Sequence, residues 1–473
     1  MWYNHNKKGA EKNMEKIALD NPPDELKIYE LSLIWKEAAY NFAFWEKLLA
    51  TLDWDKAYRD ALTTVLKTRN LHEYYLELMK FTALLRDGHT GVYFPQSVQQ
   101  SPEYTSKLPI RVAYSNGTHV VSNVKKNAAR VIKRWSVVKK VNGIDFHAYL
   151  EKNVFPYIWH EKLDSADYLI NEFFSNGPKD SQLEFEFDYG GETYTAELTR
   201  TKGDTDWMYD SELKPDEDLN EVYKSDSHKI AMTHDQIAVI TIDSMRNSDL
   251  PKEFYANFPL LEKAQGCVID IRYNTGGNSG FSDAVAAMFL GNEFQNQRYL
   301  HPIHIGAYKA WEKGVGGFSG MTWDDVVKQN GGEPNEWLEK TYKIPRHMYY
   351  ESKVNTIQVN DCPGVLTAPL VVLTTAKTGS AAEDFLVVLE HAKRATFVGT
   401  PSYGSTGNPL QYDLESGGSV RICTRHNTHI DGREFTNIGV LPHVHFEPSL
   451  EDLKQGIDSQ MGKGLETVRA MIG

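Results

Sequence analysis

The sequence predicts a multidomain α/β protein with a helical N-terminal unit, a β-rich middle module and a C-terminal domain of alternating strands and helices. The length is the first observation, because 473 residues exceed one compact core and domains span roughly 100 to 200 residues. The second is a helical period of apolar residues near the start, followed by short β-type runs. The third is an alternation of buried strand-like runs with helical patterns after residue 228, which is typical of a sheet covered by helices.

Residues 23–90 are predicted to form the helical unit, after a polar tail at residues 1–22. Apolar side chains recur at steps of three and four, which places each set on one face of a helix and allows the helices to pack together. The three sets are Ile28, Leu31, Trp35, Ala38, Phe42 and Trp45; Trp54, Tyr58, Leu62, Val65 and Leu66; and Leu76, Met79 and Leu84. The unit ends at Asp87-Gly88-His89-Thr90.

Residues 105–200 are predicted to form the β-rich module, and residues 201–227, rich in Asp, Lys and Ser, a linker. Runs such as HVVSNV and LEFEFDY are separated by Asn-Gly and Gly-Gly turns. The run VVKKVNGIDF, from Val137 to Phe146, resembles part of a PDZ domain, a module that adds peptide C-termini to a sheet edge as an extra strand. The Gly-Asp pair usual before that strand is replaced by Arg134-Trp135, so a peptide-binding module and a purely structural module both stay open.

Residues 228–450 are predicted to form the α/β domain, followed by a C-terminal helix or tail at residues 451–473. The strand candidates QIAVITID, GCVIDIR, LVVLTT and ATFVGT are separated by helical patterns. One such helix places Phe281, Ala284, Val285, Met288 and Phe289 on a single face. The region from Tyr299 to Pro363 is less regular, and we expect an insertion near the functional site.

The composition excludes several classes of protein. A formal charge of −13, with no basic run, argues against nucleic acid as a partner. No apolar run reaches the roughly 18 residues of a membrane span. The cysteines Cys267, Cys362 and Cys423 have no metal-type spacing and predict no disulfide framework. The first residues are polar, so no signal peptide is predicted.

Ser380 is predicted to lie where a helix begins, after an apolar strand and a turn that contains Gly379. A hydroxyl there lies near free backbone N–H groups and the positive end of the helix dipole, which stabilise negative charge developing on a substrate carbonyl oxygen. The alternative is a helix-capping serine without a catalytic role.

Gly276 and Gly277 lie in the segment GCVIDIRYNTGGNSG, a buried strand followed by a glycine-rich turn. Adjacent glycines allow the backbone to approach a ligand and direct N–H groups toward it. The lysine and spacing of a P-loop are absent, as is GxGxxG. The sequence therefore favours a contribution of Gly276 or Gly277 to an oxyanion hole over a phosphate-binding loop.

Five segments, in this order, resemble the C-terminal processing (tail-specific) serine peptidases. They are DIRYNTGG, TGSAAE, GTPSYG, DGR and IGVLP, which begin at Asp270, Thr378, Gly399, Asp431 and Ile438. The resemblance is good over about residues 230–450, moderate over the helical start and weak over the middle module. It implies a ClpP/crotonase-like catalytic domain, Ser380 as nucleophile, and backbone N–H groups of Gly276, Gly277 and Ala381 as oxyanion donors.

The general base departs from the serine-lysine branch of that family, which has a lysine 25 positions after the serine. Ser405 occupies this position here. His89 matches the histidine of the tricorn-like branch, and imidazole, with an ordinary pKa of about 6.5, accepts a hydroxyl proton near neutral pH. Lys377 and Lys393 are weaker rivals, and His89 as a simple turn residue is the structural alternative.

The resemblance also suggests a third group that orients the imidazole, near the C-terminal Gly-Val-x-Pro motif, and Glu434 is the candidate. A turn-decorating role for Glu434 stays open. Glu383 is expected to shape the first turn of the helix after Ser380. Metal binding by the stretch that contains His426, His429, His443 and His445 is conceivable, but nothing else in the sequence requires a metal, and no cofactor is implied.

The predicted function is a serine-type endopeptidase that acts on peptides or unfolded proteins through an acyl-enzyme, with cleavage near C-termini implied by the resemblance. The family resemblance implies a periplasmic or otherwise extracytoplasmic location. Two alternatives remain: a non-catalytic ligand-binding protein on the same fold, and a small-molecule esterase or amidase. The sequence does not indicate the oligomeric state.

Overall fold

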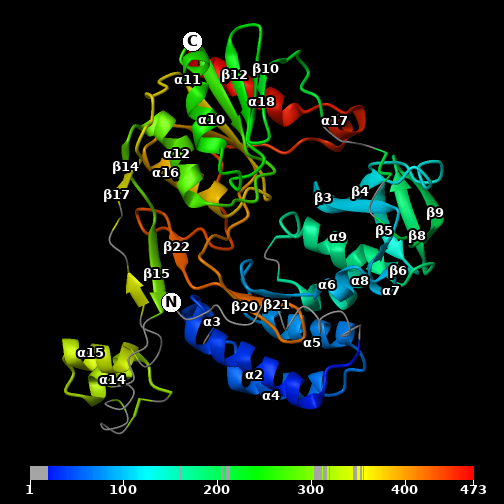
Figure 1. The fold of residues 1–473 in the computed structure, drawn as a ribbon, viewed down its shortest axis with the longest axis vertical. Helices are drawn as coiled ribbons and strands as arrows, with labels where there is room; N and C mark the ends of the chain where they lie inside the picture. Colours follow the sequence, from blue (N-terminus) through cyan, green and yellow to red (C-terminus); the bar gives the residue numbers. More distant parts are fainter. Residues whose placement is uncertain are drawn as a thin grey trace, which may run out of the picture.

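The computed structural model places three bodies around a central region (Figure 1). It describes residues 20–48, 50–159, 162–203, 206–208, 213–302, 312, 317–318, 320–344, 349–351, 354 and 356–472. The predicted tail at residues 1–22 therefore lies almost wholly outside the described residues. Within the described part of the chain, no helix combines the length and apolar character needed to cross a membrane.

The helical unit begins at residue 24, but Ile28 and Leu84 of the expected stripes are exposed, and Phe42 and Trp45 lie beyond the end of the first helix. Its helices are α2 (Asp24–Asn41), α3 (Trp45–Leu48), α4 (Trp54–Val65) and α5 (Leu71–Ala83). Asp53 and Asn70 cap α4 and α5 by accepting the backbone N–H groups of Lys56 and Glu73, which explains where these helices start.

The core of this unit is completed by a distant part of the chain. The strands β20 (Leu410–Asp413) and β21 (Ser419–Ile422) form a sheet with β1 (Gly91–Tyr93), in the order β1-β21-β20. Val420 and Ile422 are fully buried against the helices, and Tyr75 Oη lies 2.6 Å from Ser416 Oγ. The pairing of β1 with β21 positions the chain just before β1, where His89 lies.

The middle module has its own core around Phe174, Phe185 and Phe187. Its sheet has the order β3-β4-β5-β8-β9, with β6 paired to β5. These strands are β3 (Ile110–Ser115), β4 (Thr118–Val124), β5 (Val137–Val141), β6 (Ile144–Asp145), β8 (Gln182–Tyr189) and β9 (Glu192–Thr199). The helices are α8 (Phe146–Asn153) and α9 (Asp167–Ser175), and α9 packs along β3.

Short elements connect the helical unit to this module and close its base. They are α6 (Gln96–Gln99), α7 (Pro102–Thr105), the 3-10 helix η1 (Phe155–Tyr157), and the strand pair β2 (Ser106–Lys107) and β7 (Asn176–Gly177).

The C-terminal domain is a seven-stranded sheet with helices on both faces. Its strand order is β10-β11-β12-β13-β18-β19-β23, and the pairs from β12 to β23 are parallel. The strands are β10 (Asn220–Lys224), β11 (Lys229–Met232), β12 (Ile237–Thr241), β13 (Gly266–Asp270), β18 (Leu370–Thr374), β19 (Thr396–Gly399) and β23 (Val444–His445). The parallel strands β13 and β18 are buried along their whole length, as their unbroken apolar runs predict.

Alternate residues of these strands pack against helices on opposite faces. One face meets α10 (Leu250–Ala256), α11 (Phe258–Leu261), α12 (Ser279–Leu290) and α16 (Ala381–His391). The other face meets α18 (Ser459–Ile472), which follows the short α17 (Leu450–Gln455). Both α12 and α16 begin at the carboxyl edge of the sheet, where ligands of open α/β sheets bind.

Two expectations need correction or refinement. Residues 220–224, predicted to belong to a linker, form the edge strand β10, because Tyr223 packs against the sheet core. The expected insertion after Tyr299 contains a small helical pair, α14 (Trp323–Gln329) and α15 (Glu336–Lys343), with a cluster of its own at Phe318, Val326 and Leu338. Figure 1 shows this pair at the lower left, apart from the large sheet.

Strands connect the helical pair to the rest of the domain. They are β14 (Glu293–Gln295) with β17 (Thr356–Gln358), and β15 (Arg298–Pro302) with β16 (Tyr349–Glu351) and β22 (His426–Thr428).

Candidate active site

Ser380 lies in a sharp turn between β18 and α16. Its φ of 56° and ψ of −126° are unusual for a residue with a side chain, and such conformations cost roughly 1–3 kcal/mol. The surrounding structure holds the turn: Gly379 N–H donates to Asn274 O, and Ser380 N–H donates to Ser405 O, both at 3.0 Å. A strained serine at the end of a strand is typical of a nucleophile presented above a sheet.

His89 reaches this serine from the other end of the sequence. Its Nε2 lies 3.4 Å from Ser380 Oγ, and the two residues are 291 positions apart. Burial lowers the pKa of His89 to about 4, and the nearby Arg421 guanidinium adds to the effect. The ring is therefore neutral at neutral pH, which a proton acceptor requires.

The other ring nitrogen of His89 contacts a second serine, Ser405. His89 Nδ1 lies 2.5 Å from Ser405 Oγ. Ser405 is 1% exposed, and it occupies the position expected for the family's lysine.

Glu434, expected to orient His89, interacts elsewhere. Its Oε2 accepts bonds from His426 Nε2 at 2.7 Å and from Lys47 Nζ at 2.8 Å, and its Oε1 accepts Thr436 N–H. Burial alone would raise its pKa, but its bonds to His426 and Lys47 lower it to about 2. Glu434 therefore bonds to a different imidazole, that of His426, instead of to His89.

Glu383 does more than shape the first turn of α16. It is fully buried and accepts hydrogen bonds at both oxygens, from Ser402 Oγ and Gly404 N–H at Oε1, and from Ser405 N–H and Ser380 N–H at Oε2. Burial raises its pKa to about 7, although these bonds oppose the shift. One carboxyl thus joins the backbone of Ser380 to the loop that carries Ser405.

The glycine pair lies directly beside the serine. A Cβ on Gly276, whose φ is 91°, would lie 2.5 Å from Ser380 Cβ, and one on Gly277 would lie 2.2 Å from Met245 O. Gly276 N–H is already used, since it donates to Asn274 Oδ1 at 2.9 Å. Among the bonds of the described residues, the N–H groups of Gly277 and Ala381 have no acceptor, so these two are the available oxyanion donors.

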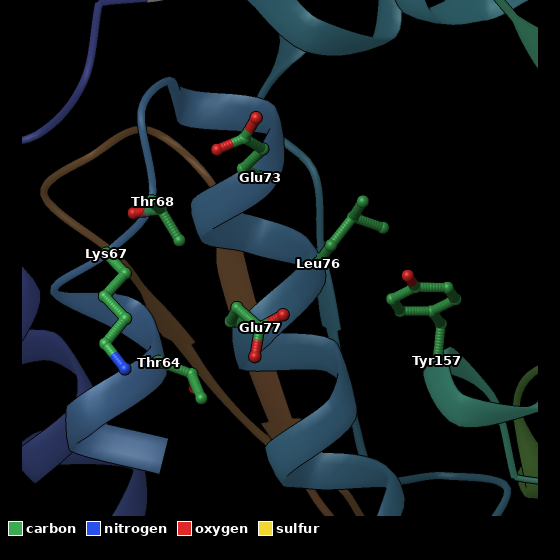
Figure 2. A pocket seen from close by; sticks show the side chains of 7 residues that line it. All are labelled: Thr64, Lys67, Thr68, Glu73, Leu76, Glu77 and Tyr157. Carbon is green, nitrogen blue, oxygen red and sulfur yellow. The ribbon is translucent and has the colours of Figure 1, made fainter. Parts of the chain in front are cut away.

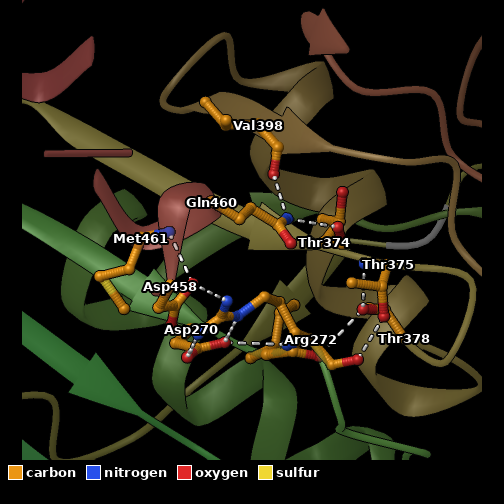
Figure 3. A network of polar contacts seen from close by, with 10 residues as sticks. Asp270, Arg272, Thr374, Thr375, Thr378, Val398, Asp458, Gln460 and Met461 are labelled. Carbon is orange, nitrogen blue, oxygen red and sulfur yellow. Dashed lines mark hydrogen bonds and ion pairs between the residues drawn. The ribbon is translucent and has the colours of Figure 1, made fainter. Parts of the chain in front are cut away.

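A buried ion network surrounds Arg272, which precedes the glycine turn by four residues (Figure 3). Arg272 donates to both oxygens of Asp270 and to both oxygens of Asp458, at 2.7–2.9 Å. Thr378 Oγ1 donates to Ile271 O, so the strand end before the glycines and the turn before Ser380 are bonded to each other. The C-terminal helix α18, which starts beside Asp458, therefore contributes to the geometry of the site.

The two lysines considered as rival bases point away from this role. Lys377 Nζ lies 3.5 Å from Asp167 Oδ2 of α9, in the middle module. Lys393 follows the C-terminal end of α16, at the opposite end of the helix from Ser380. A third lysine, Lys162, donates to the carbonyl oxygens of Ser402 and Ile438, so the middle module contacts the Ser405 loop as well.

The histidines of the predicted metal stretch have separate partners. His426 bonds to Glu434, His429 pairs with Glu390 at 2.8 Å, and His443 Nδ1 accepts Phe397 N–H at 2.9 Å. Among the described residues, no group of three or more His, Cys, Asp or Glu side chains is arranged to hold a metal ion.

Two hollows of the described structure lie outside this constellation. One of about 360 Å³ lies between α4 and α5, where Glu73, Leu76 and Glu77 face Lys67 and Tyr157 (Figure 2). Another of about 370 Å³ lies in the middle module and includes His119. Neither is lined by Ser380, His89 or the glycine turn.

Residues 236–446 match the model of peptidase family S41. The chain carries a peptidase family S41 domain. This match includes Ser380, Ser405 and the glycine turn, but not the segment that contains His89.

A curated relative also aligns with part of the chain, and solved structures share its fold. The carboxy-terminal-processing protease of Bartonella bacilliformis is 28% identical over 95 residues, which is 20% of this chain and 22% of the relative. The chain thus aligns with less than a quarter of that protein. The crystal structure of mature CPAF has a TM-score of 0.70 at 14% identity, with 95% of this chain and 98% of that chain covered. Mature CPAF complexed with lactacystin gives 0.69 at 14% identity, over 95% and 99%. At such identity these structures show a shared fold.

Proposed function

We propose that this protein is a serine-type endopeptidase that hydrolyses peptide bonds of protein or peptide substrates, with Ser380 as nucleophile and His89 as general base. The observation that carries the proposal is the 3.4 Å approach of His89 Nε2 to Ser380 Oγ. The S41 domain supports peptide substrates, and the relative named as a carboxy-terminal-processing protease supports cleavage near C-termini.

The chemistry follows from the positions of these groups. Ser380 Oγ attacks the carbonyl carbon while its proton passes to His89 Nε2, and the N–H groups of Gly277 and Ala381 donate to the new oxyanion. His89 then gives the proton to the departing amine as the C–N bond breaks. In the second half a water molecule loses a proton to His89, attacks the acyl-enzyme and returns Ser380 to its hydroxyl form.

A fluorophosphonate probe tests this assignment, because it forms a covalent bond only with an activated serine. The wild-type protein is expected to be labelled, Ser380→Ala not at all, and His89→Ala about 10²–10⁴ times more slowly, the range for loss of a general base. Ser416→Ala, which removes a buried hydroxyl bonded to Glu30 in the helical unit, serves as the matched control. A folded wild type that resists labelling would support the non-catalytic binding protein instead.

Turnover separates the two enzymatic functions. We expect cleavage of an unfolded protein or a peptide with a fluorescent leaving group, whereas an esterase or amidase would hydrolyse only small esters or amides. Activity confined to small esters would refute the peptidase assignment while leaving the serine mechanism intact.

We infer further that the PDZ-like module does not capture peptides at the β3 edge of its sheet. Strand β3 is one of the two sheet edges, and side chains of α9 already bond to its backbone groups. Val112 N–H donates to Asn171 Oδ1 at 2.9 Å, Asn171 Nδ2 donates to Val112 O at 2.7 Å, and Tyr114 N–H donates to Asp167 Oδ1 at 2.9 Å. A peptide strand added here would have to displace both side chains.

A further inference from the structure

The environment of His89 Nδ1 determines how well Nε2 can accept a proton. A neutral imidazole carries one proton, so Nε2 is an acceptor only when the proton is on Nδ1. That tautomer needs an acceptor at Nδ1, and the group in contact is Ser405 Oγ at 2.5 Å. A hydroxyl both donates and accepts, so Ser405 alone does not select the tautomer.

Ser405 is held rigidly in place. Its N–H donates to Glu383 Oε2 at 3.0 Å, and its carbonyl oxygen accepts Ser380 N–H at 3.0 Å. The residue that contacts Nδ1 is therefore bonded through its own backbone to the nucleophile, and its side chain has little freedom to turn away.

Asp87 lies close to Ser405, two residues before His89. Its side chain is 2% exposed, and its Oδ2 accepts His89 N–H at 3.1 Å and Thr90 Oγ1 at 2.7 Å. Burial raises the pKa of Asp87 to about 6, and hydrogen bonding from Thr90, the His89 N–H and Ser405 opposes this shift, so the carboxyl is ionised at neutral pH. Its buried Oδ1 has no hydrogen-bond partner within the described residues, so this oxygen is left to accept the Ser405 proton.

The carboxylate gives the chain of hydrogen bonds a direction. An ionised carboxylate only accepts, so the Ser405 proton points to Asp87, and the Ser405 lone pairs then accept the proton of His89 Nδ1. Three other groups lie nearby. Tyr403 and Cys423 lie close to Asp87, and Arg421 lies close to the His89 ring. Of these, Arg421 is a cation and cannot accept the Nδ1 proton.

We propose that Ser405 and Asp87 are a positioning pair that holds His89 with its proton on Nδ1, completing a chain Asp87–Ser405–His89–Ser380. The proposal rests on the proposed peptidase function. It assigns the orienting role to residues outside the C-terminal motif, and it gives the serine that replaces the family's lysine a task of its own.

A double-mutant cycle on the full-length protein tests the pair. Ser405→Ala and Asp87→Asn are each expected to lower kcat for a fluorogenic peptide about 10- to 100-fold, a part of what general base catalysis contributes, with KM within about twofold. Because both residues act through one tautomer, the double variant is expected to be no slower than the slower single variant. Ser416→Ala, which also removes a buried serine hydroxyl next to a buried acid, is the matched control and is expected to keep kcat.

The outcomes separate the two proposals. One outcome is that the fluorophosphonate labels Ser380 in the variants more slowly but still to completion. This result supports the pair and shows that the site is folded. Ser405→Ala with a kcat within twofold of wild type, or losses that multiply in the double variant, overturns the pair. A wild type that is neither labelled nor active overturns the peptidase function and the pair together.

Discussion

Burial sets the charge of several single residues in ways that their ordinary pKa values do not indicate. The pKa values of His89, His119 and His228 are lowered to about 4, first of all because an imidazolium is poorly solvated inside the protein. The pKa of Glu383 rises to about 7 for the same reason. These three histidines are therefore neutral around neutral pH, whereas the Glu383 carboxyl titrates there.

His119 offers a direct test at this scale, because its Nε2 is buried without a hydrogen-bond partner among the described residues and its ring contacts Phe146. Below pH 6.5 the unfolded chain takes up a proton at this position while the folded chain does not until about pH 4, so stability is lost as the pH falls through this window. Between pH 8 and pH 5, the free energy of unfolding of wild type is expected to fall by about 2 kcal/mol more than that of His119→Phe.

Urea unfolding at both pH values measures this difference. The histidines shared by the two proteins contribute equally, so subtraction isolates His119. An equal loss of stability in the variant and the wild type would contradict the burial argument.

The candidate site shows what local sequence signals can and cannot predict. Ser380 and the glycine pair stand in short segments whose strand-turn-helix order is visible in the sequence, so they could be identified individually. Ser405 could be located by its spacing from Ser380 but not given a role, because its contact with His89 spans 316 residues. Asp87 was visible only as a neighbour in the turn, and its burial depends on the fold.

The glycine turn after β13 is an element whose backbone shape determines its use. We predict that Gly276→Ala lowers kcat about 10²–10³-fold, the range for loss of one oxyanion donor, because the new Cβ would lie 2.5 Å from Ser380 Cβ and push the turn away from Ala381. Peptide hydrolysis with circular dichroism as a check on folding measures the effect.

Gly462→Ala provides the control for this substitution. It lies in α18 with open space around its Cα, so it is expected to keep full activity and to gain roughly 0.5–1 kcal/mol of stability. Equal activity of Gly276→Ala and Gly462→Ala would rule out the tight approach of the turn.

Side chains of helix α9 bond to the backbone of strand β3, and the loss of these bonds has a predictable cost. Asn171→Ala leaves the N–H and C=O groups of the buried Val112 without partners, and we expect a loss of about 1–3 kcal/mol in the free energy of unfolding. Asn153→Ala on α8, whose amide bonds to Tyr149 O at an exposed position, is expected to cost far less. Similar costs would show that α9 does not occupy β3 as described.

Across the whole molecule, periodicity predicts the elements better than it predicts their partners. The apolar runs identified β12, β13, β18 and β19, whose buried faces repeat along each strand. The same patterns gave no sign that β20 and β21 complete the core of the helical unit, because Val420 and Ile422 only show an alternation that any half-buried strand shares. Long-range pairing of this kind depends on complementary surfaces rather than on local propensity.

The C-terminal helix contributes to stability through the ion network of Figure 3. Asp458→Asn removes one of the two carboxylates that neutralise the buried Arg272 guanidinium. We expect a loss of about 3–5 kcal/mol in the free energy of unfolding. Asp235→Asn breaks the exposed pair with Arg469 and is expected to cost at most about 1 kcal/mol. Urea unfolding compares the two, and equal losses would contradict the role assigned to the buried network.

The pairing of β1 with β21 has a consequence for the life of the protein in a cell. During synthesis the histidine emerges first, and the strand that pairs with β1, Ser419–Ile422, leaves the ribosome more than 300 residues later. Until that strand is available, a growing polypeptide therefore lacks the pairing that holds the His89 turn beside Ser380.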